Sequence, residues 1–187
     1  MKTWFDAHGQ AGKMLPIVST EWGYSQCDLP NGAAVTETQQ SQYVTRIWLM
    51  HAMEGVPISI WFQWQRGDNP EDVWSHFGLK RNDGSPRPAL QAAEVLCKTL
   101  AGFRFVRRLD LKSDGVFALV FERRRLQVIA IWTIGEDVEV NVSTPGLVWN
   151  LRSMTGEEKK DVAKDQNTSV VAERSPKYLI SVAAAGE

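Results

Sequence analysis

In the first hundred residues, apolar β-branched runs alternate with longer segments of helical periodicity, and this order constrains the fold more than any other feature. Residues 15–24 read LPIVSTEWGY and residues 56–64 read VPISIWFQW, and both runs favour buried strands. Residues 36–55 and 86–102 have apolar side chains at helical spacing, and each segment ends at glycine. A strict strand, helix, strand, helix order with short connections indicates parallel βα units rather than hairpins.

The first predicted helix has one apolar stripe. The stripe consists of residues three or four positions apart, namely Val44, Ile47, Trp48, His51 and Ala52, and Gly55 provides a stop signal. A histidine on such a stripe is more often a core residue than a ligand, so we interpret His51 as structural.

After residue 102 the periodicity changes to short strand candidates. They are separated by turn signals such as Ser113-Asp114-Gly115 and Gly135-Glu136-Asp137, a pattern typical of an antiparallel β-sandwich. We therefore expect two domains, an α/β domain over residues 1–101 and an all-β sandwich domain over residues 102–187. The charged segment 157–168 is interpreted as a solvated loop with room for one strand.

The first predicted strand ends on a carboxylate, Glu21, flanked by Trp22 and Tyr24. Catalytic groups of parallel α/β folds lie at the carboxyl ends of the strands, so Glu21 stands where an active-site acid is expected. The alternative is an ordinary strand-terminal glutamate that reaches solvent or pairs with an arginine. The position alone leaves both interpretations open.

Eight tryptophans are many for 187 residues. The face of an indole suits the apolar C–H face of a pyranose ring, so tryptophans at strand ends are candidate sugar platforms. Four lie in or beside the predicted strand ends, namely Trp22, Trp61, Trp64 and Trp74. The other interpretation is core packing, which we expect for Trp48, Trp132 and Trp149; for Trp61 and Trp64 both remain open.

Three segments, TEWGYS, YVTRIWLMHAMEGVPISIWFQW and FGLKRNDGSPRPAL, resemble a known family. They are similar to the seventh and eighth βα units of the (β/α)8-barrel glycoside hydrolases of the large retaining clan that includes cellulases, mannanases and β-xylosidases. The last segment resembles the family's pattern before the final barrel helix through Phe77, Gly78, Leu79, Asp83, Gly84, Pro86, Arg87, Pro88 and Ala89. The resemblance covers roughly residues 12 to 100 well and the remainder loosely.

The resemblance implies a partial (β/α)8 barrel with strands seven and eight, followed by a β-sandwich that such hydrolases often carry beside the barrel. It implies that Glu21 is the catalytic nucleophile and that the substrate is a carbohydrate. The residues that it implies for substrate binding are Trp22, Tyr24, Trp61, Trp64, Asp68 and His76.

The sequence departs from this family in one decisive respect. The general acid/base of the clan is usually the glutamate of an Asn-Glu-Pro motif on strand four, and this sequence has no Asn-Glu pair. A whole barrel takes about 250 residues, so strands one to six are missing. The rim carboxylates that remain as substitutes are Asp68, Glu71 and Asp72. We therefore expect a hydrolase fragment that is inactive alone.

Three interpretations of such a fragment remain open. The first is the C-terminal portion of a larger enzyme, and the second is one half of a split enzyme whose partner is the missing N-terminal barrel segment. The third is a non-catalytic carbohydrate-binding or scaffolding module in which the β-sandwich is the working part.

Charge and cysteine usage argue against other classes. The formal charge of −1 predicts no attraction to nucleic acid or an anionic membrane. Cys27 and Cys97 show no CxxC spacing, and His8, His51 and His76 form no metal-binding motif, so we expect no metal and no cofactor. The first residues lack the apolar run of a signal peptide, which leaves secretion of a longer parent open.

Overall fold

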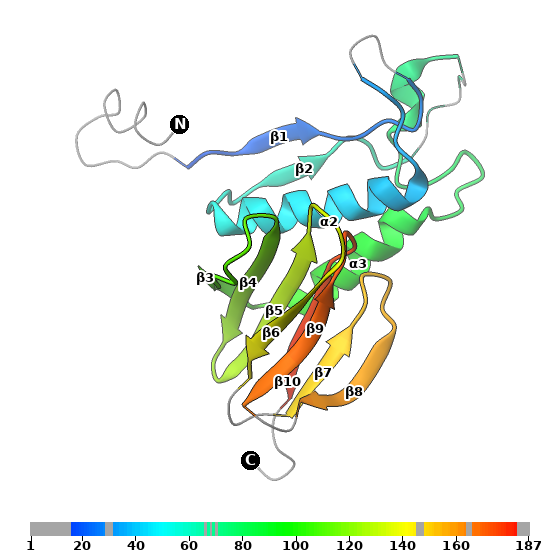
Figure 1. Ribbon diagram of the computed structural model, residues 1–187. Coiled ribbons are helices and arrows are strands. Elements are labelled where there is room, and N and C mark those ends of the chain that lie inside the picture. The colour runs from blue at the N-terminus through cyan, green and yellow to red at the C-terminus, as the bar shows by residue number, and fades with distance from the viewer. Residues whose placement is uncertain are drawn as a thin grey trace.

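Two helices lie between a pair of parallel strands and a block of antiparallel strands, as the computed structural model shows (Figure 1). The structure describes residues 16–28, 32–65, 67, 69, 71–144, 148–163 and 166–182. None of the helices within these ranges is long and apolar enough to cross a membrane.

The parallel pair consists of β1 (Ser19–Trp22) and β2 (Ser59–Trp61). Ser19 lies opposite Ser59 and Trp22 opposite Trp61, with an irregularity in β1 between the two pairs. Helix α2 (Glu37–Met53) connects the strands, and α3 (Pro88–Leu100) follows a 3₁₀ turn, η1 (Val73–His76). The expected parallel βα connection is therefore confirmed.

Helix α2 begins with a complete capping box. The Thr36 hydroxyl accepts a hydrogen bond from the Gln39 backbone N–H at 3.1 Å, and the Gln39 side chain accepts one from the Thr36 N–H at 2.9 Å. Each bond satisfies a backbone donor that the first turn of a helix leaves unpaired. After the last turn, Gly55 has φ of +69°, a conformation that favours glycine.

The expectation of a single apolar stripe on α2 is wrong, because the helix packs on two sides. Val44 lies in a cluster with Trp61 on β2 and Leu90 on α3. Leu49 lies in a second cluster with residues of the antiparallel sheet. Trp48 contacts both clusters, while Ala52, expected on the stripe, is exposed.

The expectation that both parallel strands are buried is also wrong, because one face of the strand pair is exposed. Ile17 and Val18 are 38% and 42% exposed, and Ile58 and Ile60 are 53% and 51% exposed. Because alternate residues of a strand point to opposite faces, Trp61 packs against the helices while Ile58 and Ile60 point away. Within the described residues, that second face of the pair has no cover.

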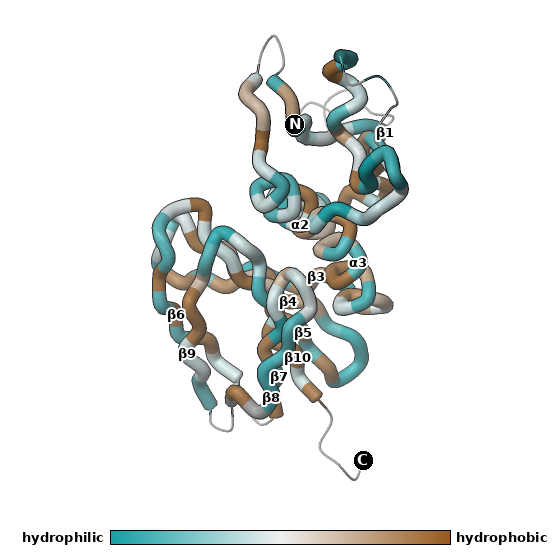
Figure 2. The backbone as a smooth tube through the Cα atoms, turned by 90° about the vertical axis from the view of Figure 1, so that its right-hand side faces the viewer, coloured by the Kyte–Doolittle hydropathy of each residue, from teal (hydrophilic) through white to brown (hydrophobic). Residues whose placement is uncertain are grey.

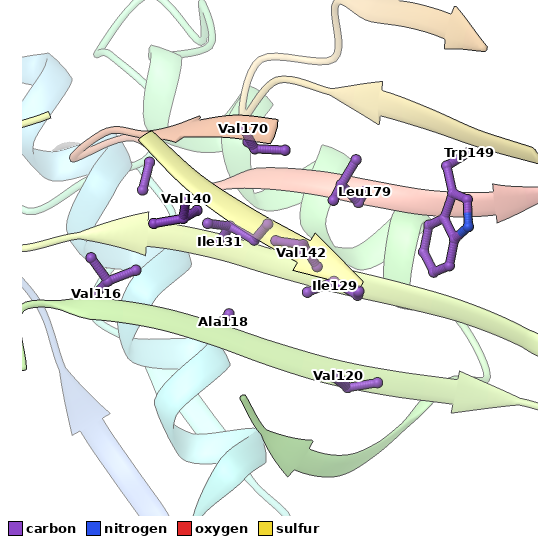
Figure 3. Close-up of a cluster of buried hydrophobic side chains, with 11 residues drawn as sticks. Val116, Ala118, Val120, Ile129, Ile131, Val140, Val142, Trp149, Val170 and Leu179 are labelled. Atoms are coloured by element: carbon purple, nitrogen blue, oxygen red, sulfur yellow. The ribbon is translucent and has the colours of Figure 1, made fainter. Parts of the chain in front are cut away.

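The antiparallel block contains two sheets, and its pairing agrees with the antiparallel expectation. The larger sheet has the order β3-β4-β5-β10-β7-β8 and the smaller one pairs β6 with β9. Figure 3 shows the cluster between them, which includes Ile131, Val142, Val170 and Leu179. The strand bounds are β3 Arg104–Arg108, β4 Val116–Arg123, β5 Leu126–Thr133, β6 Val138–Ser143, β7 Val148–Arg152, β8 Glu158–Ala163, β9 Asn167–Ala172 and β10 Lys177–Val182.

The segment 157–168, interpreted as a solvated loop with room for one strand, contains β8 and the start of β9. The charged composition has a physical reason, since β8 is an edge strand and charged side chains protect such an edge from unwanted pairing. In β9 buried and exposed residues alternate strictly, because one face packs on the larger sheet and the other meets solvent.

The helices cover the other face of the larger sheet. Leu49 of α2 and Leu96 of α3 share a buried cluster with Leu119, Phe121 and Tyr178 of the sheet. Figure 2 shows α2 and α3 between β1 and the antiparallel strands. The change from helix to strand falls at residue 102, where the chain turns through a glycine with φ of +76°.

Candidate functional site

Glu21 is exposed and lies one residue before the end of β1. Its side chain makes no hydrogen bond or ion pair with any other residue that the structure describes. Its neighbour Trp22 packs against α2, so alternation along the strand directs Glu21 toward the uncovered face. Glu21 therefore lies near the end of the strand, as the sequence predicts, and its carboxylate is exposed.

The ends of β1 and β2 approach so closely that only glycine fits at position 23. A Cβ there would meet the Phe62 carbonyl oxygen at 2.3 Å and the Phe77 Cδ1 at 2.8 Å. The Phe62 N–H also donates to the Trp22 carbonyl at 2.8 Å. These backbone contacts fix the position of Glu21 relative to the end of β2.

A hydrogen-bonded chain anchors Trp22 behind Glu21. The indole Nε1–H of Trp22 donates to Ser59 Oγ at 2.9 Å, and Ser59 Oγ lies 2.6 Å from Nδ1 of His51. Because the indole is only a donor, the Ser59 hydroxyl is free to donate its own hydrogen to a neutral imidazole. Burial lowers the pKa of His51, which favours that neutral form.

The aromatic residues on the helix side of the strands are packed together. Trp61 is 8% exposed, and its Nε1–H donates to the Phe77 carbonyl at 3.1 Å. Tyr24 lies against Tyr43, with ring centroids 4.6 Å apart, and burial raises its pKa. These rings, with Trp22, form a wall behind the strand ends.

The side chains that face solvent come from the segment after β2. Trp64 is 58% exposed, and the Lys80 ammonium lies 4.9 Å from the centre of its ring. His76 is half-buried on η1, and its carbonyl accepts a hydrogen bond from the Gln26 N–H at 3.2 Å. Asp68, expected to bind substrate, lies outside the described residues. The Asp72 side chain caps η1 by accepting from the Trp74 N–H.

A polar hollow of about 540 Å³ lies beside His76. Its lining consists of Gln26, His76, Arg81, Asn82, Asp83 and Arg87. The guanidinium groups of the two arginines are held by Glu37 on the first turn of α2, at 2.6 Å for Arg81 and 3.1 Å for Arg87. The lining contains two guanidinium groups and one carboxylate, Asp83, and Glu37, which pairs with both guanidinium groups, supplies a second negative charge beside the hollow.

Two supporting residues escaped the sequence analysis. Gln40 is fully buried on α2, and its amide donates to the Tyr24 carbonyl at 2.9 Å and accepts from the Gln26 side chain at 3.0 Å. Its polar character gave no sign of burial. Glu37 had no role in the sequence analysis, because nothing in the sequence shows that it lies beside Arg81 and Arg87, more than forty residues away along the chain.

Comparison with known proteins reveals a shared fold. No protein-family model matches the sequence, and no curated protein matches it either. Several solved structures of glycoside hydrolases share its fold.

One of these is a family 39 glycoside hydrolase from the gut symbiont Bacteroides cellulosilyticus WH2, with a TM-score of 0.80 and 23% identity over 97% of this chain. A family 30 endoxylanase from Clostridium papyrosolvens C71 has a TM-score of 0.62, with 11% identity over 92% of the chain. A family 39 β-xylosidase from Caulobacter crescentus has a TM-score of 0.58, with 14% identity over 97%. At these identities the similarity defines a common fold.

The chain spans less than half of each of these proteins. It covers 37% of the first, 43% of the second and 47% of the third. Nearly all of this chain therefore has a counterpart in glycoside hydrolases that contain much more polypeptide.

Proposed function

We propose that this chain is the part of a retaining glycoside hydrolase that carries the nucleophile, Glu21. The observation that carries the proposal is an exposed carboxylate near the end of a parallel strand, without a partner among the described residues, in a fold shared over 97% of the chain with a glycoside hydrolase. Carbohydrate is the substrate class that these neighbours imply.

The uncovered side of the strand pair supports the view that the chain is one part of a barrel. Ile60 on β2 and Ile58 just before it are about half exposed, and each strand pairs on one edge only within the described residues. Strands with bare edges and an apolar face usually associate with further strands. Six more βα units would pair with both edges, close the barrel and cover this face.

In the completed site, Glu21 attacks the anomeric carbon and forms a covalent glycosyl ester. A second carboxylic acid, about 5 Å away, protonates the departing oxygen; it then acts as a base toward the water that releases the sugar. We assign that second group to the missing part of the barrel. Help from a general acid/base is typically worth roughly 10² to 10⁴ in rate, so the chain alone is inactive.

The six implied substrate-binding residues divide by their surroundings. We propose that Trp64, Asp68 and His76 contact the sugar from the segment after β2. Trp22, Tyr24 and Trp61 form the packed wall behind the strand ends, and we propose that they hold Glu21 in place.

A mechanism-based 2-fluoro glycoside tests the assignment of Glu21. The fluorine slows breakdown of the glycosyl ester, so the nucleophile of a retaining enzyme accumulates as an adduct. In the enzyme completed by the missing barrel segment, peptide mapping should place the adduct on Glu21, and Glu21→Gln should abolish labelling. Glu136→Gln is the matched control, because Glu136 is also an exposed glutamate but lies between β5 and β6 in the antiparallel block. An adduct on another carboxylate, or an inverted product anomer, would overturn the assignment.

The alternative of a non-catalytic carbohydrate-binding sandwich has less support. Its candidate platforms, Trp132 and Trp149, are 1% and 0% exposed, so neither offers a ring face to a sugar.

A further inference from the structure

Trp74 on η1, one of the four tryptophans that the sequence places in or beside the strand ends, has no role in the proposed function. It is 59% exposed, and its ring stacks on the buried ring of Phe77 with centroids 5.9 Å apart and an angle of 17° between the planes. The two rings are nearly parallel and offset, so Phe77 supports the indole on one side, while more than half of the Trp74 surface is open to solvent.

The backbone of Trp74 is held on both sides. Its N–H donates to Asp72 Oδ1 at 3.0 Å, and its carbonyl accepts from the Gln63 side chain at 2.9 Å. Gln63 lies just after β2, and its own carbonyl accepts from the Leu79 N–H at 3.1 Å. The backbone that carries the exposed ring is thus fixed to the end of β2. A ligand that stacks on the ring therefore meets a preorganised surface, and less conformational entropy is lost on binding.

The other exposed indole of this region differs in its electronic environment. Trp64 has the Lys80 ammonium 4.9 Å from its ring centre. A cation over an aromatic face draws on the same negative π density that attracts the C–H groups of a sugar. The partner of Trp74 is a neutral ring, so its open face keeps that density.

We propose that Trp74 is a platform for a neutral pyranose unit of the glycan. This inference rests on the proposed function for its ligand class and adds a binding position outside the residues implied by family resemblance. In the neighbouring hollow, which His76 of the same 3₁₀ turn lines, Asp83 and the nearby Glu37 offset the charges of the two arginines, and this also fits a neutral, hydroxyl-rich ligand. The occupant is a sugar ring stacked on the solvent face of the indole.

The test is a titration of the isotopically labelled chain with xylotetraose and with cellotetraose, followed by NMR. We expect the indole N–H signal of Trp74, identified with Trp74→Phe, to shift and saturate with millimolar sugar, together with the amide signals of Ser75 and Phe77. When the affinity is measured from the shifts of those amides, Trp74→Ala should bind the sugar about tenfold more weakly, which is the loss expected for one aromatic contact. Trp74→Phe should retain a measurable part of the affinity, and Ile134→Ala should retain all of it, because Ile134 is equally exposed but aliphatic and lies beyond β5.

Two results would overturn the inference: absence of any shift with both sugars, or binding that Trp74→Ala leaves unchanged. Neither result bears on the nucleophile. A 2-fluoro glycoside adduct on Glu21 without binding at Trp74 would leave the proposed function standing, and sugar binding at Trp74 with an adduct elsewhere would remove only the assignment of Glu21.

Discussion

At the scale of single residues, a titratable side chain stands behind the candidate nucleophile. His51 reaches Trp22 through Ser59 and also packs edge-on against the Trp22 ring, with centroids 5.7 Å apart. Protonation would turn Nδ1 from an acceptor into a donor and leave the Ser59 hydrogen without this partner. The placement of Trp22, and through it the end of β1, therefore depends on a neutral histidine.

We predict that the free energy of unfolding falls as the pH decreases from about 7 to about 5, partly because of His51. Burial lowers the pKa of His51 in the folded chain below its ordinary value of 6.5. As the pH falls, the unfolded chain therefore binds a proton at His51 before the folded chain does, and this protonation stabilises the unfolded chain. The contribution of neutral His51 to the free energy of unfolding is fully present above the pKa of the unfolded chain, and it is lost as the pH falls through the pKa of the folded chain. Urea unfolding at several pH values measures the slope, which should be smaller in His51→Gln. Equal slopes in the two proteins would contradict this role.

The sequence identified some of these residues and not others, for physical reasons. Glu21 could be placed because an apolar run ending in a carboxylate marks a strand end. The burial of Trp61 could not be predicted, since the side of a strand on which a residue lies depends on what covers each face. Trp74 carries no local signal of exposure, because its surface depends on Phe77 beneath it.

At the scale of elements, α2 links the other parts of the molecule. One side packs on β2 and α3 around Val44, and the other packs on the antiparallel sheet around Leu49. The start of the helix also carries Glu37, which binds Arg81 and Arg87. The beginning of α2 thus determines the geometry of both the core and the rim.

Removal of the capping box should measurably destabilise the protein. Thr36→Ala deletes the acceptor for the Gln39 N–H, and we predict a loss of about 1 kcal/mol in the free energy of unfolding. Thr36→Ser keeps a hydroxyl at the same position and should lose much less, which makes it the matched control. Urea denaturation monitored by circular dichroism measures both. Equal stability of Thr36→Ala and the parent would show that the cap contributes nothing here.

The extent of this helix was predictable, because its cap and stop residues are local signals. Its packing was not, since the apolar residues alone suggested one stripe and the structure has two buried sides. The antiparallel strands with apolar runs were likewise expected, whereas β8 at the sheet edge was anticipated only as one possible strand within a solvated loop, because its charged composition gives a weak strand signal.

At the scale of the whole molecule, the two regions that the sequence separates at residue 102 share a buried cluster. Leu49 and Leu96 from the helices meet Phe121 and Tyr178 from the sheet. The parallel strands β1 and β2 form the opposite, half-covered layer. Stability is therefore expected to be highest in the central strands of the larger sheet and lowest in the parallel pair.

Native-state hydrogen exchange of the 187-residue chain tests this distribution. The slowest amides should lie in β4, β5 and β10, because β5 is paired on both edges and most of its residues are buried. Amides of β2 should exchange faster, since Ile58 and Ile60 face solvent and one edge of the strand is bare within the described residues. Equal or greater protection of residues 58–62 would refute this expectation.

The position of β10 in the larger sheet has a consequence for synthesis on the ribosome. This strand lies between β5 and β7, although β6, β7, β8 and β9 are all translated before it. At roughly 5 to 20 residues per second, several seconds pass between the emergence of β5 and of its neighbour. During that interval the apolar side of α2 around Leu49 lacks Tyr178 and Ile180, so a nascent chain at this stage should be a preferred client of chaperones that bind exposed apolar segments.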